Sequence, residues 1–353
     1  MTLPHFETSG IAASDTRIDP SAPGRGALPA SYENDRARVT AAMRRLVALA
    51  STGVGDLCAY HLGWTERSGA PARGGTGKML RPVLCLTACR GYGEDQLAVS
   101  VAAAIELLHA FSLVHDDIED GDQLRHGRET LWVMAGLPLA LNAGDYLFAL
   151  ANRALCEAVQ LLPPDRHARA LAMFNDAYLR MIEGQHLDIE FEQREHVTAE
   201  EYARMVRGKT GALLGASLAL GALFGGAPAD DVDALGEAGV DLGLAFQAVD
   251  DALAVWGDPA VTGKAVGNDL VRGKKSLPLV LAVERGWRFS RDSTIEMDGL
   301  RASFDQLGVR DAVRQYAHEH AERALKRVHA TRMRAEARVE LERLFAFILA
   351  RDS

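Results

Sequence analysis

Two long apolar runs, each ending in a cluster of acidic residues, constrain the fold of this chain more than any other feature. The first run ends at Asp116-Asp117-Ile118-Glu119-Asp120 and the second at Asp250-Asp251. Both runs are rich in Ala and Leu, and their apolar residues recur every three or four positions, which predicts helices. Carboxylates brought close together repel one another unless a cation neutralises them. The sequence therefore predicts a helical protein in which two helix ends hold cations.

The helical pattern continues from about residue 35 to the C-terminus, and alternating runs of β-branched residues are scarce. Glycine and proline pairs such as Pro163-Pro164 and Gly225-Gly226 separate the helices without forming a domain linker. We expect one all-α domain over residues 35–353, with the acidic helix ends facing each other across a central cavity. Residues 1–34 are predicted to form a disordered arm. The helices are expected at about residues 35–62, 79–90, 96–119, 129–135, 139–161, 165–185, 199–206, 209–225, 229–256, 275–285, 300–305, 308–328 and 331–350.

The composition narrows the class of protein. A net charge of −9 argues against a nucleic-acid partner. No apolar run approaches the ~18 uninterrupted residues of a membrane span, and no signal peptide is evident, so we expect a chain that does not span a membrane. The 4 cysteines show neither a CxxC pair nor zinc-ligand spacing, which predicts buried thiols in a reducing compartment. These features together predict a cytoplasmic protein.

The first acidic cluster has the geometry of a metal site. Asp116 and Asp120 are four positions apart and share one helix face. Mg²⁺ usually binds one or two carboxylates together with substrate phosphates. Asp117 lies about 100° round the helix and is expected to serve as an outer ligand or partner. The alternative is a solvated acidic helix end, although acid at a C-terminal end opposes the helix dipole.

Residues suited to phosphate binding occur at several places along the chain. Arg can donate two hydrogen bonds to one phosphate, and helix N-termini favour anions. A glycine-rich and lysine-rich segment after the second acidic cluster would suit a lid over a metal-bound diphosphate. The candidates are Lys78, Arg81, Arg125, His126, Lys209, Thr210, Gln247, Lys264 and Lys274.

Seven motifs in this chain, in the same order, resemble those of the trans-isoprenyl diphosphate synthases, or polyprenyl synthetases. The motifs are GKMLRP, LLHAFSLVHDDIED, RHG, EGQHLD, KTGALL, FQAVDD and GKAVGNDLVRGKKSLP. The resemblance runs from about residue 40 to the C-terminus. It implies the isoprenoid-synthase helical bundle, a homodimer, and condensation of isopentenyl diphosphate with an allylic diphosphate. It also implies a cofactor of three Mg²⁺ ions in each active site.

The resemblance also implies roles for individual residues. Lys78, Arg81 and His109 would bind isopentenyl diphosphate. Asp116 and Asp120 would hold two Mg²⁺, and Asp250 a third, with Asp251 as its partner through water. The allylic substrate would contact Arg125, Lys209, Thr210, Gln247 and Lys264, while Lys274 would belong to the closing loop and Gln185 and Asp188 would line the cavity. The implied catalytic set is Asp116, Asp117, Asp120, Lys209, Gln247, Asp250, Asp251 and Lys264.

Some residues depart from the family pattern. His126 stands where the family has a second Arg; it can still donate to a phosphate, with a charge that depends on pH. Ala254 replaces a third acid in the second cluster, which leaves metal binding there to Asp250. Ala248 and Ala252 replace bulkier apolar residues.

The residues before the first acidic cluster bear on product length. Phe111 and Ser112 lie five and four positions before Asp116, and in the family such residues help to form the floor of the chain pocket. A large residue beside a small one predicts geranylgeranyl diphosphate (C20). Farnesyl diphosphate or longer chains remain alternatives, as do a class I terpene cyclase and a non-catalytic subunit of a heteromeric synthase.

Overall fold

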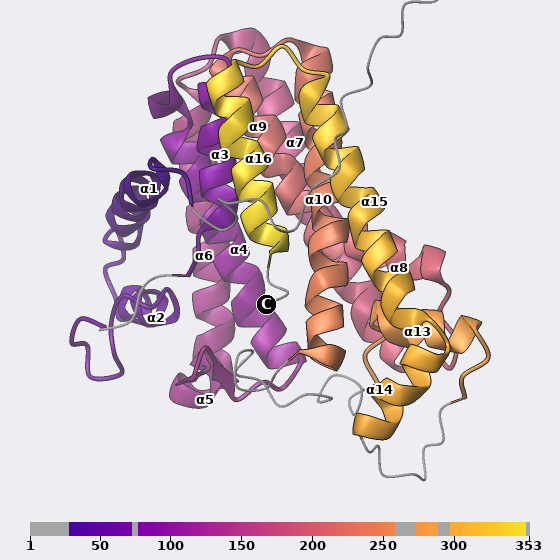
Figure 1. Cartoon of the computed structure of the whole chain (residues 1–353). Helices are drawn as coiled ribbons and strands as arrows, with labels where there is room; N and C mark the ends of the chain where they lie inside the picture. The colour runs from indigo at the N-terminus through magenta and orange to yellow at the C-terminus, as the bar shows by residue number, and fades with distance from the viewer. Residues whose placement is uncertain (1–27, 73–76, 258–272, 289–296, 351–353) are drawn as a thin grey trace, which may run out of the picture.

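The computed structural model describes residues 28–72, 77–257, 273–288 and 297–350, and this part of the chain is almost entirely helical (Figure 1). The prediction of an all-α fold is therefore confirmed. The helices are α1 (Tyr32–Val47), α2 (Val54–His61), α3 (Leu80–Arg90), η1 (Asp95–Ala98), α4 (Val99–Glu119), α5 (Leu131–Ala135), α6 (Leu137–Val159), α7 (Pro164–Glu192), α8 (Ala199–Val206), η2 (Arg207–Gly211), α9 (Ala212–Gly225), α10 (Ala229–Trp256), α13 (Leu277–Glu284), α14 (Met297–Gln306), α15 (Val309–His329) and α16 (Ala335–Leu349). One two-stranded ribbon, β1 (Leu124–Arg125) and β2 (Arg128–Glu129), follows α4.

Several predicted boundaries were wrong. The helix expected over residues 35–62 is two helices, because Ser51-Thr52-Gly53 interrupts it. The folded part also begins before residue 35, since Tyr32 is buried in the core at 3% exposure. The helix expected to end at residue 185 continues to Glu192. The helices predicted over residues 199–206 and 229–256 have the predicted bounds.

The main hydrophobic core surrounds α4, which packs against α1, α3 and α6. Leu84, Ile105 and Leu107 are fully buried there, and each such burial stabilises the fold by roughly 1.5–3 kcal/mol. Glycine allows neighbouring helices to approach closely. A Cβ atom added to Gly221 of α9 would lie 2.1 Å from the carbonyl oxygen of Cys85 in α3. Because of this close contact, α3 and α9 form a tightly packed pair at the centre of the bundle.

A second hydrophobic cluster surrounds the C-terminal half of α10, where α8, α13, α14 and α15 gather (Figure 1). Tyr202 and Phe304 are among its largest fully buried side chains. Helix α10 belongs to both clusters, because Leu242 lies in the first and Leu244 in the second. The C-terminal ends of α4 and α10, which carry the two acidic clusters, lie at the same end of the molecule (Figure 1).

Two helical stretches have the length and hydropathy of a membrane span, which the sequence was not expected to contain. They are Asp95–Glu119 and Ala199–Gly225. Their most apolar windows are 61% and 83% buried inside the protein. These stretches are core helices of the bundle, and their burial accounts for their apolar character.

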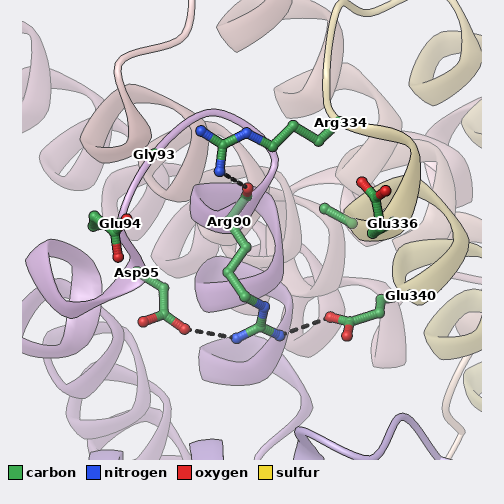
Figure 2. Close-up of a pocket in the computed structure, with 8 residues that line it drawn as sticks. Arg90, Gly93, Glu94, Asp95, Arg334, Glu336 and Glu340 are labelled. Atoms are coloured by element: carbon green, nitrogen blue, oxygen red, sulfur yellow. Dashed lines mark hydrogen bonds and ion pairs between the residues drawn. The ribbon is translucent and has the colours of Figure 1, made fainter.

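A surface pocket of about 360 Å³ lies between the end of α3 and α16 (Figure 2). Its charged side chains bind one another: Arg90 lies between Asp95 and Glu340, and Arg334 reaches the carbonyl of Arg90. The pocket is at the start of α4, about 30 Å along that helix from the acidic cluster. It is therefore separate from the two acidic helix ends.

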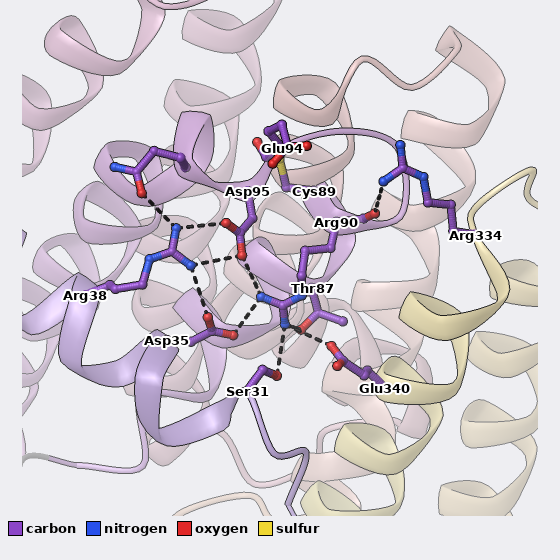
Figure 3. Close-up of polar contacts among 11 residues, drawn as sticks. Ser31, Asp35, Arg38, Thr87, Cys89, Arg90, Glu94, Asp95, Arg334 and Glu340 are labelled. Atoms are coloured by element: carbon purple, nitrogen blue, oxygen red, sulfur yellow. Dashed lines mark hydrogen bonds and ion pairs between the residues drawn. The ribbon is translucent and has the colours of Figure 1, made fainter.

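The same charges fasten the N-terminal helix to the bundle (Figure 3). The guanidinium of Arg90 donates to Asp35 of α1 at 2.9 Å, to Asp95 of η1 at 2.8 Å and to Glu340 of α16 at 2.9 Å. Arg38 of α1 also donates to Asp95, at 2.8 Å. Asp35 is only 1% exposed, so loss of Arg90 would leave a buried charge poorly paired, which typically costs about 3–5 kcal/mol. This network fixes α1 beside the C-terminal end of α3.

Candidate active site

Asp116 and Asp120, at the C-terminal end of α4, form the acidic side of the site. Burial raises the pKa of Asp116 to about 6, and the charges of Asp120 and Glu119 add to this rise. The ammonium group of Lys209 acts in the opposite direction. The carboxylate of Asp116 thus lies where a cation would stabilise its ionised form.

Side chains of the turn η2 interact with both helices that carry acidic clusters, α4 and α10. Residues Ala199–Gly225 form one continuous helix, interrupted only by the π turn η2, and such turns occur frequently at functional sites. Lys209 and Thr210 therefore lie inside a helix. The sequence had predicted a helix start at residue 209, which is wrong. The charge of Lys209 acts on Asp116 of α4, while the hydroxyl of Thr210 donates to Gln247 of α10 at 3.0 Å. Two consecutive residues thus interact with the two helices that carry the acidic clusters, Lys209 through its charge and Thr210 through a hydrogen bond.

Glycines let η2 approach α7 closely. A Cβ atom added to Gly184 would lie 2.1 Å from the backbone nitrogen of Lys209, and one added to Gly208 would lie 2.5 Å from the carbonyl of Arg180. The backbones of α7 and η2 are therefore in direct contact, which explains why position 184, inside α7, is a glycine. This contact sets the position of Lys209.

Asp188 of α7 binds two lysines. Its Oδ2 atom accepts from Lys209 at 2.6 Å and from Lys274 at 2.8 Å. Lys274 also pairs with Asp120 at 2.8 Å and with Glu192 at 2.8 Å. Burial lowers the pKa of Lys274, but the surrounding carboxylates outweigh it and raise that pKa above its ordinary value. The two ammonium groups likewise outweigh burial and lower the pKa of Asp188.

Asp250 and Asp251 of α10 have different surroundings although they are adjacent. Asp251 is buried and accepts hydrogen bonds from the Tyr202 hydroxyl at 2.7 Å, from Gln247 at 2.9 Å and from the Leu277 amide at 2.7 Å. Burial raises the pKa of Asp251 to about 6. Both of its oxygens thus have protein donors, and Asp251 orients Gln247 and the start of α13. Asp250 is only half-buried, and its charge acts on Arg81.

Arg81 of α3 and His109 of α4 come together, while the exposed Lys78 has its Nζ atom 5.5 Å from the centre of the Phe347 ring in α16. Arg81 Nη1 lies 3.2 Å from His109 Nε2. Burial lowers the pKa of His109 well below its ordinary value, and the charge of Arg81 adds to this, so the neutral ring accepts the hydrogen bond from Arg81. Lys78 precedes α3, because Met79 adopts a left-handed conformation with φ 48° before the helix begins at Leu80. The hydroxyl of Tyr32 in α1 donates to the carbonyl of Lys78.

Arg125 and His126 lie in the β1–β2 ribbon and not in an irregular loop. His126 has φ 51° and Gly127 has φ 76°, as a tight two-residue hairpin turn requires. The Nε and Nη2 atoms of Arg125 bind Oδ1 of Asp117 at 2.8 and 2.7 Å. Asp117 is 1% exposed, and through its Oδ1 atom it anchors the ribbon to α4. His126 is exposed.

Phe111 belongs to an aromatic group below the acidic cluster. The centre of its ring lies 4.7 Å from that of His115 and 5.2 Å from that of Phe148 in α6. The centre of the Phe148 ring lies 5.2 Å from that of Tyr178 in α7. Ser112 donates to the carbonyl of His109 at 2.9 Å, within its own helix. The aromatic rings therefore connect three helices about 7.5 Å along α4 from Asp116.

Some site residues were missed or cannot be placed. Lys264 lies outside the described residues. Gln185, predicted to line the cavity, donates to Glu119 at 2.7 Å. Sequence reasoning missed Glu192, which its position one helical turn after Asp188 could have indicated. It also missed Tyr202, whose bond to Asp251 has no local sequence signal.

The oxygen-rich donor set fits Mg²⁺. Within the described ranges, no three His, Cys, Asp or Glu side chains come close enough to hold a metal by themselves. Mg²⁺ typically takes only one or two carboxylates and completes its shell with phosphate and water. The half-buried Asp116, with its raised pKa, is a carboxylate that such an ion would stabilise.

Comparisons with known proteins bear on the fold and the family of this chain. Residues 68–303 match the family model described as polyprenyl synthetase. A (2E,6E)-farnesyl diphosphate synthase of Mycobacterium tuberculosis is 39% identical over 251 residues, covering 70% of this chain and 68% of that protein. A geranylgeranyl diphosphate synthase of the same species is 40% identical over 264 residues, covering 73% and 75%. The crystal structure of a polyprenyl synthetase from Streptomyces coelicolor superimposes with a TM-score of 0.83 at 35% identity, covering 90% of this chain and 98% of that one.

Proposed function

Because this chain belongs to the polyprenyl synthetase family of trans-prenyltransferases, we propose that it condenses isopentenyl diphosphate with an allylic diphosphate. The observation that best supports this reaction is the position of η2, where Lys209 faces the acids of α4 while Thr210 binds Gln247 of α10. A diphosphate between these helices would meet cationic and hydroxyl donors on one side and carboxylates on the other.

Two separate sets of residues would bind the two diphosphates. Lys209 and Lys274, fixed by Asp188, would hold the allylic diphosphate together with Thr210 and Gln247. On the other side of α4, Lys78 and Arg81 would hold isopentenyl diphosphate. The neutral ring of His109 orients Arg81 by accepting its hydrogen bond.

Asp116, Asp120 and Asp250 would hold Mg²⁺, which when bound would neutralise the leaving diphosphate and favour ionisation of the allylic substrate to a carbocation. Asp116 and Asp120 are four positions apart on one face of α4. Asp250 lies near the C-terminal end of α10, which is at the same end of the molecule as the C-terminal end of α4 (Figure 1). The apolar helices around them would exclude water, which would otherwise quench the cation. A count of three ions per site is part of this proposal.

Geranylgeranyl diphosphate is the proposed product. The growing chain would extend along α4 from Asp116 toward Phe111, where the rings of Phe111, Phe148 and Tyr178 would form a barrier. This barrier spans three helices, so removal of one ring should open it only partly. Farnesyl diphosphate is the alternative favoured by the names of some relatives.

The assembly proposed is a cytoplasmic homodimer. Large apolar side chains are exposed on α6 and α7, which contact each other, with Leu139 at 52%, Leu179 at 52% and Ile182 at 48% exposure. Exposed apolar side chains gathered on neighbouring helices are typical of an interface. The partner that fits is a second copy of the chain, as the family resemblance implies.

A product assay tests the proposed reaction. The purified full-length chain is incubated with Mg²⁺, isopentenyl diphosphate and, separately, C5, C10 and C15 allylic diphosphates, and the dephosphorylated alcohols are sized. We expect a C20 alcohol that disappears in Asp116→Ala and a longer product from Phe111→Ala. A C15 product from the native chain would overturn the chain-length proposal alone. No condensation with any primer would overturn the reaction and favour a non-catalytic subunit, while a cyclic hydrocarbon made from the allylic substrate alone would identify a cyclase.

A further inference from the structure

Glu106 of α4 is a carboxylate within the group that would hold isopentenyl diphosphate. It precedes His109 by one helical turn, so the two side chains share a face of α4. Its charge interacts with Arg81 of α3 and Arg36 of α1. Its Oε2 atom is buried, and among the residues that the structure describes it has no hydrogen-bond partner. A buried acid with an unused oxygen needs an explanation in a site for an anion.

The surroundings of Glu106 bring the pKa of its carboxyl group close to neutral pH. Burial raises its pKa to about 7, and the attraction of Arg81 and Arg36 offsets only part of this rise. The charge of Glu106 also contributes to the raised pKa of Tyr32 in α1. On its own helix, burial and Arg81 keep His109 neutral.

Neither of the other nearby titratable groups can take up the proton in its place. His61 of α2 contacts the carbonyl of Ala110 at 3.0 Å, and burial lowers its pKa to about 4. Burial raises the pKa of Tyr32 above its ordinary value, so it keeps its proton at neutral pH. Among these groups, only Glu106 changes charge near pH 7.

Entry of a diphosphate adds negative charge beside Lys78 and Arg81. This charge repels an ionised Glu106 and competes with it for the guanidinium of Arg81. We propose that Glu106 is a positioning residue that takes up one proton from solvent when isopentenyl diphosphate binds, and that Oε2 then donates its hydrogen to the diphosphate. The proton returns to solvent when this site empties. This inference rests on the proposed function, which places isopentenyl diphosphate in this site.

The sign of the pH effect follows from linkage. Below about pH 7 Glu106 already holds its proton, and binding does not depend on it. Above that value each binding event must capture a proton, so affinity for isopentenyl diphosphate falls by up to about tenfold for each pH unit. The allylic diphosphate, held by Lys209 and Lys274, should show no such dependence.

Calorimetry of the full-length protein with isopentenyl diphosphate at pH 8 tests the proposal directly. Titrations in HEPES and in Tris, whose ionisation enthalpies differ, count the protons taken up. We expect uptake approaching one proton in the native protein and less in Glu106→Gln, which keeps the shape but cannot ionise. The exposed Glu183→Gln of α7 serves as the control and should behave as the native chain.

Steady-state kinetics between pH 6.5 and 8.5 provide the second readout. The KM for isopentenyl diphosphate should rise with pH in the native enzyme and stay nearly flat in Glu106→Gln, while the KM for the allylic substrate is the same in both. Equal proton uptake and parallel pH profiles in the two proteins would overturn the role of Glu106 and leave the proposed function standing. Absence of any binding of isopentenyl diphosphate by the native protein would overturn both.

Discussion

Asp188 determines the position of two ammonium groups at once. Its Oδ2 atom lies 2.6 Å from Lys209 Nζ and 2.8 Å from Lys274 Nζ, and the two lysines come from segments 65 positions apart in the sequence (274 − 209). Two like charges near each other repel, and the attraction of both to a carboxylate between them offsets that repulsion. Asp188 is thus the residue that allows both cations to face the same anion.

Replacing Asp188 with Asn should therefore weaken the allylic site. The amide keeps the shape but loses the charge that holds the lysines, so we expect kcat/KM for the allylic diphosphate to fall by about 10- to 100-fold. The KM for isopentenyl diphosphate should change little. Steady-state kinetics with each substrate varied in turn provide the measurement. The exposed Glu190→Gln on the same helix is the control, and an equal effect on both substrates would contradict a local role.

Adjacent acids look alike in the sequence but differ in their surroundings. Asp116 and Asp250, the proposed metal ligands, are both half-buried. Asp117 and Asp251 were expected to support the metal, yet each is buried against donors from elsewhere in the chain. Sequence spacing shows which face of a helix a carboxylate occupies. It cannot show that Arg125 of the ribbon donates to Asp117, or that the backbone amide of Leu277 donates to Asp251.

Helices α7 and η2 meet through backbone atoms at Gly184 and Gly208. A methyl group at either position would displace one segment from the other. Close contact of this kind transmits any shift of α7 to Lys209. The geometry of the site therefore depends on two residues without side chains.

Gly184→Ala should accordingly harm both stability and activity. The added Cβ atom would lie 2.1 Å from the nitrogen of Lys209, and we expect the free energy of unfolding to fall by about 1–3 kcal/mol. Urea unfolding and kcat provide the two measurements. Gly299→Ala in α14 is the matched control, because nothing lies within 4 Å of its added Cβ atom. That control should gain up to about 1 kcal/mol, and a similar gain in Gly184→Ala would refute the contact.

The sequence predicted most helices but not how they continue or break. The helix predicted to end at residue 185 continues to Glu192, and only the contact with η2 shows why Gly184 within it carries no side chain. The π turn carries no local signal, so the start predicted at residue 209 was in fact the interior of a longer helix. The β1–β2 ribbon was missed because two-residue strands are too short for a periodic pattern.

At the scale of the molecule, the exposed faces of α6 and α7 suggest that the chain does not act alone. We expect the native protein to be a dimer by light scattering at micromolar concentration. Ile182→Asp should produce a monomer, because a charge in an apolar interface lacks a partner. Val339 on α16 is 44% exposed but lies on another helix, so Val339→Asp should remain dimeric. A native monomer would contradict the proposed interface.

The arrangement of the helices in space came from the structure. The family motifs predicted an all-α bundle, and this is confirmed. They did not reveal that α10 belongs to two hydrophobic clusters, or that Arg90 joins α1 to α16. Contacts between segments far apart in the sequence depend on the whole fold, and no local pattern records them.

The π turn at Arg207–Gly211 constrains which insertions and deletions this chain can tolerate during evolution. A π turn contains one residue more than the α-helical turn that would replace it. Deleting any residue there would rewind the segment and rotate the helix before it by about 100° relative to α9. Lys209 and Thr210 could then no longer face α4 and α10 together. The length of this stretch is therefore constrained as well as the identities of Gly208, Lys209 and Thr210, so related chains that keep the site should show no insertion or deletion here.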